Sequence, residues 1–137
     1  MRAYMIIAPV LLAAFATSGI AAEDKPPKLT AKQQAALDKE LKGKVPGKKQ
    51  SCISLTQRAD LQIISDELLL YKAGRTIYVN RVLGSCNGLS LGRALVTNIF
   101  GSQLCRGDIA RVADFNSDML TGSCALGDFV PYRPAGK

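Results

Sequence analysis

The amino-acid sequence predicts a small, mainly β protein, built as an antiparallel barrel or sandwich with an N-terminal helix and stapled by disulfides. Beyond residue 51, apolar runs of strand length alternate with turn residues at intervals of about ten residues, which is typical of all-β domains. Four cysteines, without a CxxC pair, favour disulfides. A helix with recognisable start and stop signals precedes the first cysteine.

Residues 1–22 have the order of a secretory signal peptide. Arg2 precedes an apolar run over 3–15, small residues lead to Ala22, and the first acidic residue, Glu23, follows. We expect cleavage after Ala22 and a periplasmic or secreted mature protein. The alternative is an uncleaved anchor, because residues 3–22 are numerous enough to span a bilayer.

Residues 23–50 form a lysine-rich lead-in with eight lysines, four acidic residues and no arginine or aromatic residue. Thr30 and Gln33 have the spacing of a capping box and Gly43 is a stop signal, so we expect a helix over 31–42. The lysines are either a solvated spacer or a contact with an anionic component of the cell envelope. They are Lys25, Lys28, Lys32, Lys39, Lys42, Lys44, Lys48 and Lys49.

Residues 51–137 are predicted to form one β-rich domain. Its strands are expected at 52–55, 61–65, 68–73, 76–83, 94–100, 108–113 and 125–130. Tight turns at 66–67 and 74–75 join three of them into an antiparallel meander over 61–83. The strand at 76–83 has apolar residues on both faces, which favours a central position in its sheet. Residues 87–94 are either a short helical turn or a loop.

Cys52, Cys86, Cys105 and Cys124 are expected to form two disulfides rather than a zinc site, because zinc ligands usually come in closely spaced pairs. We expect Cys52 to pair with Cys124 and Cys86 with Cys105, since the first and last strands of a closing barrel are commonly neighbours. The other two connectivities remain open at this point.

Four features of the domain carry recognisable motifs: the cysteine that opens the first strand, GRTIYVNRVLGSCNGL, QLCRGDIARV and GSCALGDF. Together they resemble a family of small exported proteobacterial proteins that is classified only as a domain of unknown function. The resemblance covers about residues 52–129, and LCRGD and 122–129 are its most specific parts. The chain departs from the family at 77–78, where Ile-Tyr replaces Trp-Tyr. The resemblance implies an envelope location and a self-contained cysteine-bearing domain, and it implies no activity.

The absence of histidine excludes imidazole-based catalysis and histidine metal sites. Residues 106–108 spell the integrin-binding tripeptide, but the triplet has the residues of a turn that opens a strand. Asp114, Asn116 and Asp118 alternate like calcium ligands, but Met119 and Ala125 replace the glycine and glutamate of that loop.

Arginines and two tyrosines have the side-chain types of a phosphate-binding face with stacking surfaces, although arginines scattered through strands usually pair with acids. They are Arg58, Arg75, Arg81, Arg93, Arg106, Arg111, Tyr71 and Tyr78.

We therefore expect a monomeric exported module that acts by binding or structural support in the envelope. No catalytic residue, cofactor, metal or specific nucleic-acid partner is expected, and the partner is unknown beyond an anionic envelope component. The alternative is a small envelope hydrolase with a carboxylate pair, as in glycosidases. Its candidate acids are Asp60, Asp66, Glu67, Asp108, Asp114, Asp118 and Asp128.

Overall fold

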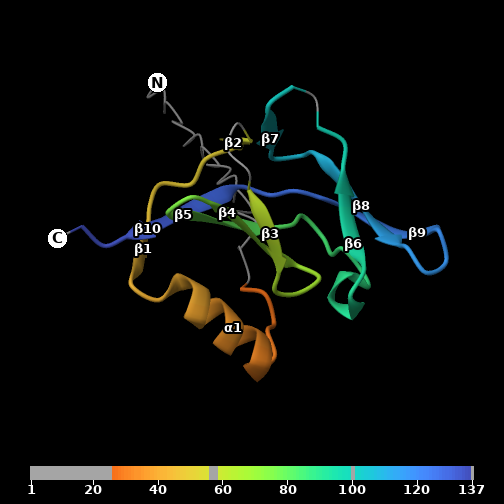
Figure 1. Ribbon diagram of the computed structural model, residues 1–137, viewed down its shortest axis with the longest axis horizontal. Helices are drawn as coiled ribbons and strands as arrows, with labels where there is room; N and C mark the ends of the chain where they lie inside the picture. Colours follow the sequence, from red (N-terminus) through yellow and green to blue (C-terminus); the bar gives the residue numbers. More distant parts are fainter. Residues whose placement is uncertain (1–25, 56–58, 100, 137) are drawn as a thin grey trace, which may run out of the picture.

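The computed structural model describes residues 26–55, 59–99 and 101–136, so the predicted signal peptide lies outside the described residues. Within these ranges one α-helix on the N-terminal side is followed by antiparallel strands in three sheets (Figure 1). The predicted fold class, mainly β with an N-terminal helix and disulfides, is confirmed. None of the helical residues in the described ranges forms a segment long and apolar enough to cross a bilayer.

The largest sheet has the strand order β1 (Lys44–Pro46), β10 (Phe129–Pro134), β5 (Thr76–Arg81), β4 (Leu68–Ala73) and β3 (Asp60–Ile63). Strands β3, β4 and β5 pair consecutively, which confirms the predicted meander. Strand β5 lies between β10 and β4, so its predicted central position is also confirmed.

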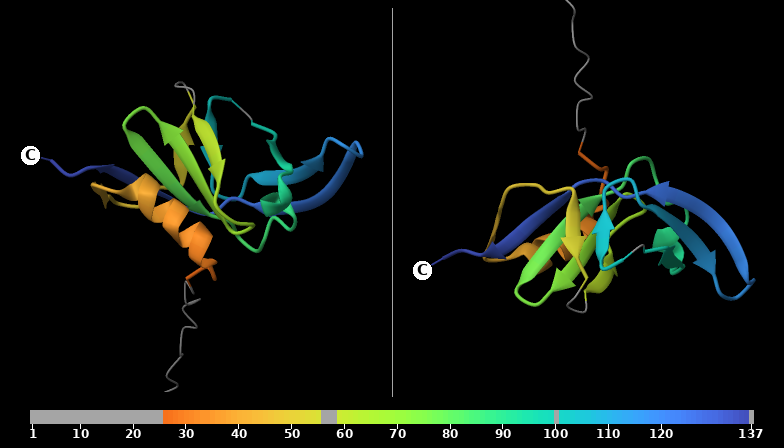
Figure 2. Two further views of the ribbon diagram at one scale, coloured as in Figure 1. Left: turned by 60° about the horizontal axis from the view of Figure 1, so that its bottom comes forward. Right: turned by 90° about the horizontal axis from the view of Figure 1, so that it is seen from above.

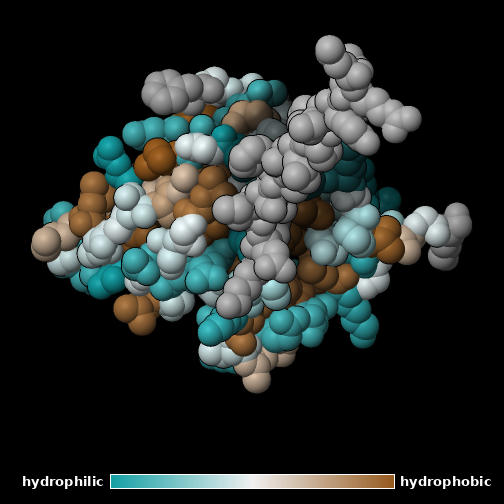
Figure 3. Space-filling view, turned by 180° about the vertical axis from the view of Figure 1, so that it is seen from behind, coloured by the Kyte–Doolittle hydropathy of each residue, from teal (hydrophilic) through white to brown (hydrophobic). Residues whose placement is uncertain are grey.

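Two smaller sheets complete the fold: β2 (Cys52–Ser54) with β7 (Gln103–Cys105), and β6 (Ala94–Thr97) with β8 (Ile109–Asp114) and β9 (Met119–Ala125). Residues 87–94, expected as either a short helical turn or a loop, contain the 3-10 turn η1 (Leu89–Leu91). Strands β8 and β9 extend as an arm at the end of the molecule away from the C-terminus (Figures 1 and 2). Apolar side chains are exposed on this arm, at the left of Figure 3.

Four differences from the predicted strands have a common cause. Strands β1, β7 and most of β9 were not predicted, and the single strand expected over 125–130 is the end of β9 and the start of β10. These segments are short, or rich in glycine and polar residues, so their strand conformation depends on pairing with distant segments. Hydrophobic alternation along the chain does not reveal such pairing.

Helix α1 (Ala31–Leu41) begins at the predicted capping box. The Gln33 N–H donates to Thr30 Oγ1 at 3.3 Å, and the Thr30 N–H donates to Gln33 Oε1 at 2.9 Å. After the helix, Gly43 adopts a φ of 72°, a conformation that favours glycine and ends the helix. Both predicted end signals are therefore confirmed.

The helix packs on one face of the five-stranded sheet through a thin apolar stripe that includes Leu37 and Leu41. Beneath the helix lies a cluster of buried residues: Ile64, Leu68, Leu70 and Ile77. Strand β1 follows the helix and pairs with β10. Part of the lead-in is thus packed against the β-rich part of the chain. The domain boundary near residue 50 stays a prediction, and truncation at this point tests it.

The main core fills the space between the opposite face of this sheet and the two smaller sheets. Leu69, Val112 and Phe129 come from three different strands and are fully buried there, and the Tyr71 ring meets the Phe129 ring edge-on at 5.7 Å. Among the described residues, apolar side chains therefore fill the space between the sheets.

Both disulfides are present, but their predicted pairing was wrong: Cys52 pairs with Cys105, and Cys86 with Cys124. Strand β2 pairs with β7, which places Cys52 directly opposite Cys105. The expectation that the first and last cysteines are neighbours failed because Cys124 lies on β9, in another sheet. Two disulfides are typical of proteins from an oxidising, extracytoplasmic compartment.

Candidate functional site

A groove of about 800 Å³ lies on the same face of the five-stranded sheet that α1 covers elsewhere. Its floor contains Leu68 from β4, Val79 from β5 and Val130 from β10. Val79 and Val130 are direct cross-strand partners. The volume is within the range of small-molecule sites. We call this space the basic groove, because of the charges at its rim.

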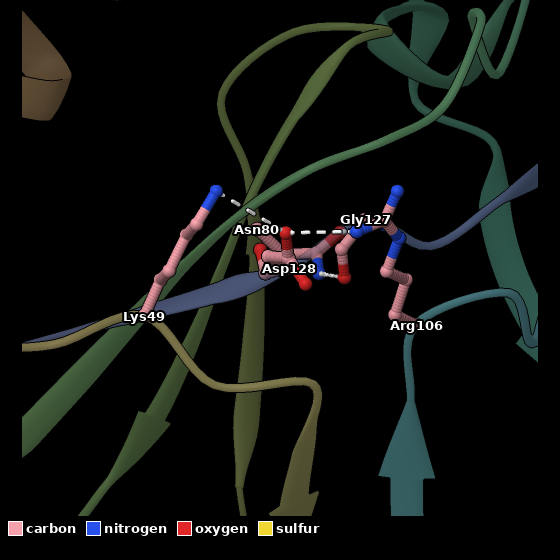
Figure 4. Close-up of polar contacts among 5 residues, drawn as sticks. All are labelled: Lys49, Asn80, Arg106, Gly127 and Asp128. Carbon is pink, nitrogen blue, oxygen red and sulfur yellow. Dashed lines mark hydrogen bonds and ion pairs between the residues drawn. The ribbon is translucent and has the colours of Figure 1, made fainter.

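The rim of the basic groove has three cations, Lys49, Arg81 and Arg106, and two acids, Glu67 and Asp128. Lys49 Nζ lies 3.7 Å from Asp128 Oδ2, and Arg106 Nη1 lies 3.2 Å from the same oxygen. The two cations approach from opposite sides of the carboxylate (Figure 4). Their side chains are 66% and 54% exposed, whereas that of Asp128 is 21% exposed, so the cations remain accessible to a ligand.

The position of Asp128 is fixed from beneath by a buried amide. Asn80 on β5 is fully buried, and its Nδ2 donates to the Gly127 carbonyl oxygen at 2.8 Å and to the Asp128 carbonyl oxygen at 3.4 Å. The Gly127 N–H donates back to Asn80 Oδ1 at 3.4 Å (Figure 4). The side chain of Asn80 therefore clamps the segment that carries the rim carboxylate.

Residue 127 has to be glycine for this contact. A Cβ atom there would overlap the carbonyl oxygen of Arg81, which belongs to the backbone and cannot turn away. The close approach lets the chain cross from β9 to β10 beside the end of β5. Asn80 and Gly127 thus position the rim of the groove. Neither residue was predicted from the sequence to belong to a site. An amide in the middle of an apolar strand was the one signal for the clamp.

The eight lysines proposed as an anionic contact do not converge on one site. Among the seven of these lysines that the structure describes, Lys49 alone lines the basic groove. Lys25 lies outside the described residues, and Lys44 is half-buried on β1. The others are exposed at and around α1 or before β2: Lys28, Lys32, Lys39, Lys42 and Lys48.

The proposed arginine face is also dispersed. Arg81 and Arg106 reach the basic groove, whereas Arg93 pairs with Asp114 at 3.4 Å. The other described members of the proposed set, Arg75 and Arg111, lie at the β4–β5 turn and on β8, and Arg58 falls outside the described residues. Tyr71 is buried in the main core, so it offers no stacking surface.

Most acids proposed for a hydrolase have structural partners instead. Asp66 accepts from the Gly88 and Ser90 N–H groups at 3.0 and 2.6 Å. Burial alone would raise the pKa of Asp66, but these N–H groups and nearby Arg93 outweigh it and lower the pKa.

The two aspartate motifs noted in the sequence also have a backbone role. Asp108 accepts from the Cys105 N–H at 2.7 Å, after Gly107 turns the chain at a φ of 91°. Asp114 accepts from the Asn116 N–H at 3.0 Å, which lowers the pKa of Asp114. Across residues 26–55, 59–99 and 101–136, no group of three or more potential ligands is arranged to hold a metal ion.

Glu67 and Asp128 are the two proposed acids that share the basic groove. Asp128 already forms ion pairs with Lys49 and Arg106, so the groove presents bound carboxylate and accessible cations. This arrangement suits the binding of an anion better than proton transfer, which needs a carboxyl group free to exchange its proton with substrate.

Comparison with known proteins adds no relative: no family model, curated protein or solved structure matches the chain. The resemblance to a family of exported proteobacterial proteins therefore stays a prediction.

Proposed function

We propose that this protein is an exported binding module, periplasmic or secreted, and that it binds an anionic component of the cell envelope at the basic groove. The observation that carries the proposal is the convergence of Lys49 and Arg106 on Asp128. A guanidinium has five N–H donors and an ammonium three, and Asp128 uses only part of this capacity. A carboxylate or phosphate group of a ligand can therefore bridge the two cations.

The overall charge supports an anionic partner. The chain has a formal net charge of +7, and +6 after the proposed removal of residues 1–22, which contain Arg2; this charge attracts anions over a distance set by salt. The exposed lysines around α1 add to this attraction without forming a site of their own. Attraction from scattered lysines is unspecific, whereas the groove provides fixed geometry.

The carboxylate hydrolase is the weaker proposal. Glu67 and Asp128 share the groove, but the clamp by Asn80 and the two ion pairs give Asp128 a positioning role for cations. Inverting and retaining glycosidases need one carboxyl group that protonates the leaving oxygen. The contacts of Asp128 supply no such proton.

Titration with inorganic phosphate, followed by NMR on the mature protein, tests the proposal. We expect shifts concentrated at residues around Lys49 and Arg106, with binding that weakens as salt is added. Arg106→Gln should weaken binding about tenfold, the effect of losing one charge-assisted hydrogen bond of about 1.5 kcal/mol. The matched control is Arg111→Gln, an exposed arginine on β8. Equal losses in both variants would contradict a groove site.

The proposed location has its own test. Mass spectrometry of the exported protein should find a mature N-terminus at Glu23 or within two residues of it. A protein that retains Met1 in the membrane fraction would replace the cleaved signal with an anchor.

A further inference from the structure

We infer that the ligand of the basic groove is a single-chain anionic amphiphile, whose acidic head group binds Lys49 and Arg106 and whose alkyl chain lies on the floor. The inference rests on the proposed function, because the head group uses the same cations. It goes further by assigning the rest of the groove. The observation behind it is an apolar surface in direct continuation with a charged rim.

The floor is part of an apolar sheet face that α1 leaves partly uncovered. Leu68 and Val79 belong to the cluster beneath the helix, yet both also line the groove. Val79 lies in register between Leu70, beneath the helix, and Val130, in the groove. Water over such a floor is released when an alkyl chain covers it.

The charged rim and the apolar floor are adjacent along β5. Arg81 follows Val79 by two residues, which at about 3.3 Å per residue separates rim from floor by roughly 7 Å. Leu83 is 48% exposed and lines the groove next to the rim. A small inorganic anion reaches the rim alone, whereas a head group with an attached alkyl chain contacts both parts.

Two other occupants fit the groove less well. A charged polymer would use the cations but leave Val79 and Val130 in water. An uncharged lipid would cover the floor but would offer no acidic group to Lys49 and Arg106, the exposed cations that converge on Asp128. The combination of the two surfaces favours an amphiphile with one acidic group.

Calorimetric titration of the mature protein distinguishes these occupants. The probes are inorganic phosphate, octyl phosphate, dodecyl phosphate and the uncharged dodecyl maltoside, each below the concentration at which it forms micelles. A fully buried methylene strengthens binding about fourfold, and a half-open groove should give about twofold. We therefore expect dodecyl phosphate to bind about 16-fold more tightly than octyl phosphate, and inorganic phosphate to bind most weakly.

Floor and rim variants separate the two parts of the site. Val79→Thr and Val130→Thr keep the shape and the strand preference of valine but make the floor polar, so they should weaken dodecyl phosphate about tenfold and leave inorganic phosphate unchanged. Arg106→Gln should weaken both probes. The matched control is Val96→Thr, at an exposed valine on β6. If a floor variant fails to fold, the chain-length series on the unaltered protein decides the question.

Each contrary outcome has a distinct meaning. Equal affinity for inorganic, octyl and dodecyl phosphate overturns the amphiphile and leaves the proposed anion site intact. Equal affinity for dodecyl maltoside and dodecyl phosphate overturns the role of the cations, and with it the proposed function. Binding of none of the probes overturns both.

Discussion

Replacing Asn80 with alanine should destabilise the protein strongly, because Asn80 is fully buried and its amide group is the hydrogen-bond partner of the Gly127 backbone. Its Nδ2 donates to the Gly127 carbonyl at 2.8 Å, and its Oδ1 accepts from the Gly127 N–H at 3.4 Å. Both Asn80 and Gly127 are buried, so the variant leaves two backbone groups without a partner. Each such group costs about 1–3 kcal/mol, and one of the bonds is long. We expect the free energy of unfolding to fall by about 2–4 kcal/mol.

Urea denaturation with the disulfides intact measures this effect. With an m-value of about 1.5 kcal/mol/M, a loss of 2–4 kcal/mol moves the midpoint by about 1.3–2.7 M. The matched control is Asn116→Ala, at an exposed asparagine in the β8–β9 turn, which should move the midpoint by less than about 0.3 M. A midpoint of Asn80→Ala within the range of this control would refute the clamp.

An isosteric change gives an independent check with a definite sign. Asn80→Asp puts a carboxyl group in the same buried place, where desolvation raises its pKa above that of the unfolded chain. Stability from a raised pKa is present at low pH and lost as pH rises. Asn80→Asp should therefore become more stable when pH falls from 7 to 5, because the protonated carboxyl regains a donor for Gly127. The unaltered protein should show no such gain.

Three further predictions concern the rest of the fold. The buried hydroxyl of Tyr71 has no hydrogen-bond partner among the described residues, so Tyr71→Phe should leave the free energy of unfolding unchanged or raise it by up to about 1 kcal/mol; a larger loss in urea denaturation would contradict this. The pKa of Asp66 is lower in the folded protein than in the unfolded chain, so ionised Asp66 stabilises the fold, and this stability is lost as pH falls through the folded-state pKa. Asp66→Asn should therefore make the acid unfolding curve below about pH 4 less steep. A protein starting at Ser51 lacks α1 and β1, so its free energy of unfolding should fall by about 3–5 kcal/mol, estimated from three half-buried leucines (Leu29, Leu37 and Leu41) and β1; an unchanged melting curve would instead indicate an independent β domain.

The parts of the fold that were predicted correctly depend on signals close together in the sequence. Thr30, Gln33 and Gly43 mark the ends of α1 within a few residues of it. The meander of β3, β4 and β5 follows from two tight turns and strand-length apolar runs. In each case the residues that make the contact are neighbours in the chain, so propensity and pattern suffice.

The parts that were not predicted depend on contacts between distant segments. The cysteine pairing follows from β2 lying beside β7, and nothing near Cys52 in the sequence indicates this neighbour. For the same reason, Lys49 is one of eight equivalent lysines in the sequence, and Arg106 is one of several scattered arginines. Only the crossing at Gly127, which brings Asp128 between them, distinguishes these two from the rest.

The order of the disulfides along the chain has a consequence for biogenesis. The first cysteine pairs with the third and the second with the fourth, with separations of 53 and 38 residues, so the two covalent loops are interlaced. If the protein is exported from its N-terminus, as we propose, Cys52 and Cys86 reach the oxidising compartment before Cys105, and oxidation at that moment would join the wrong pair. Reaching the native pairing then requires thiol–disulfide exchange through a mixed disulfide. The yield of natively paired protein should therefore depend on a disulfide isomerase in that compartment, and not on an oxidant alone.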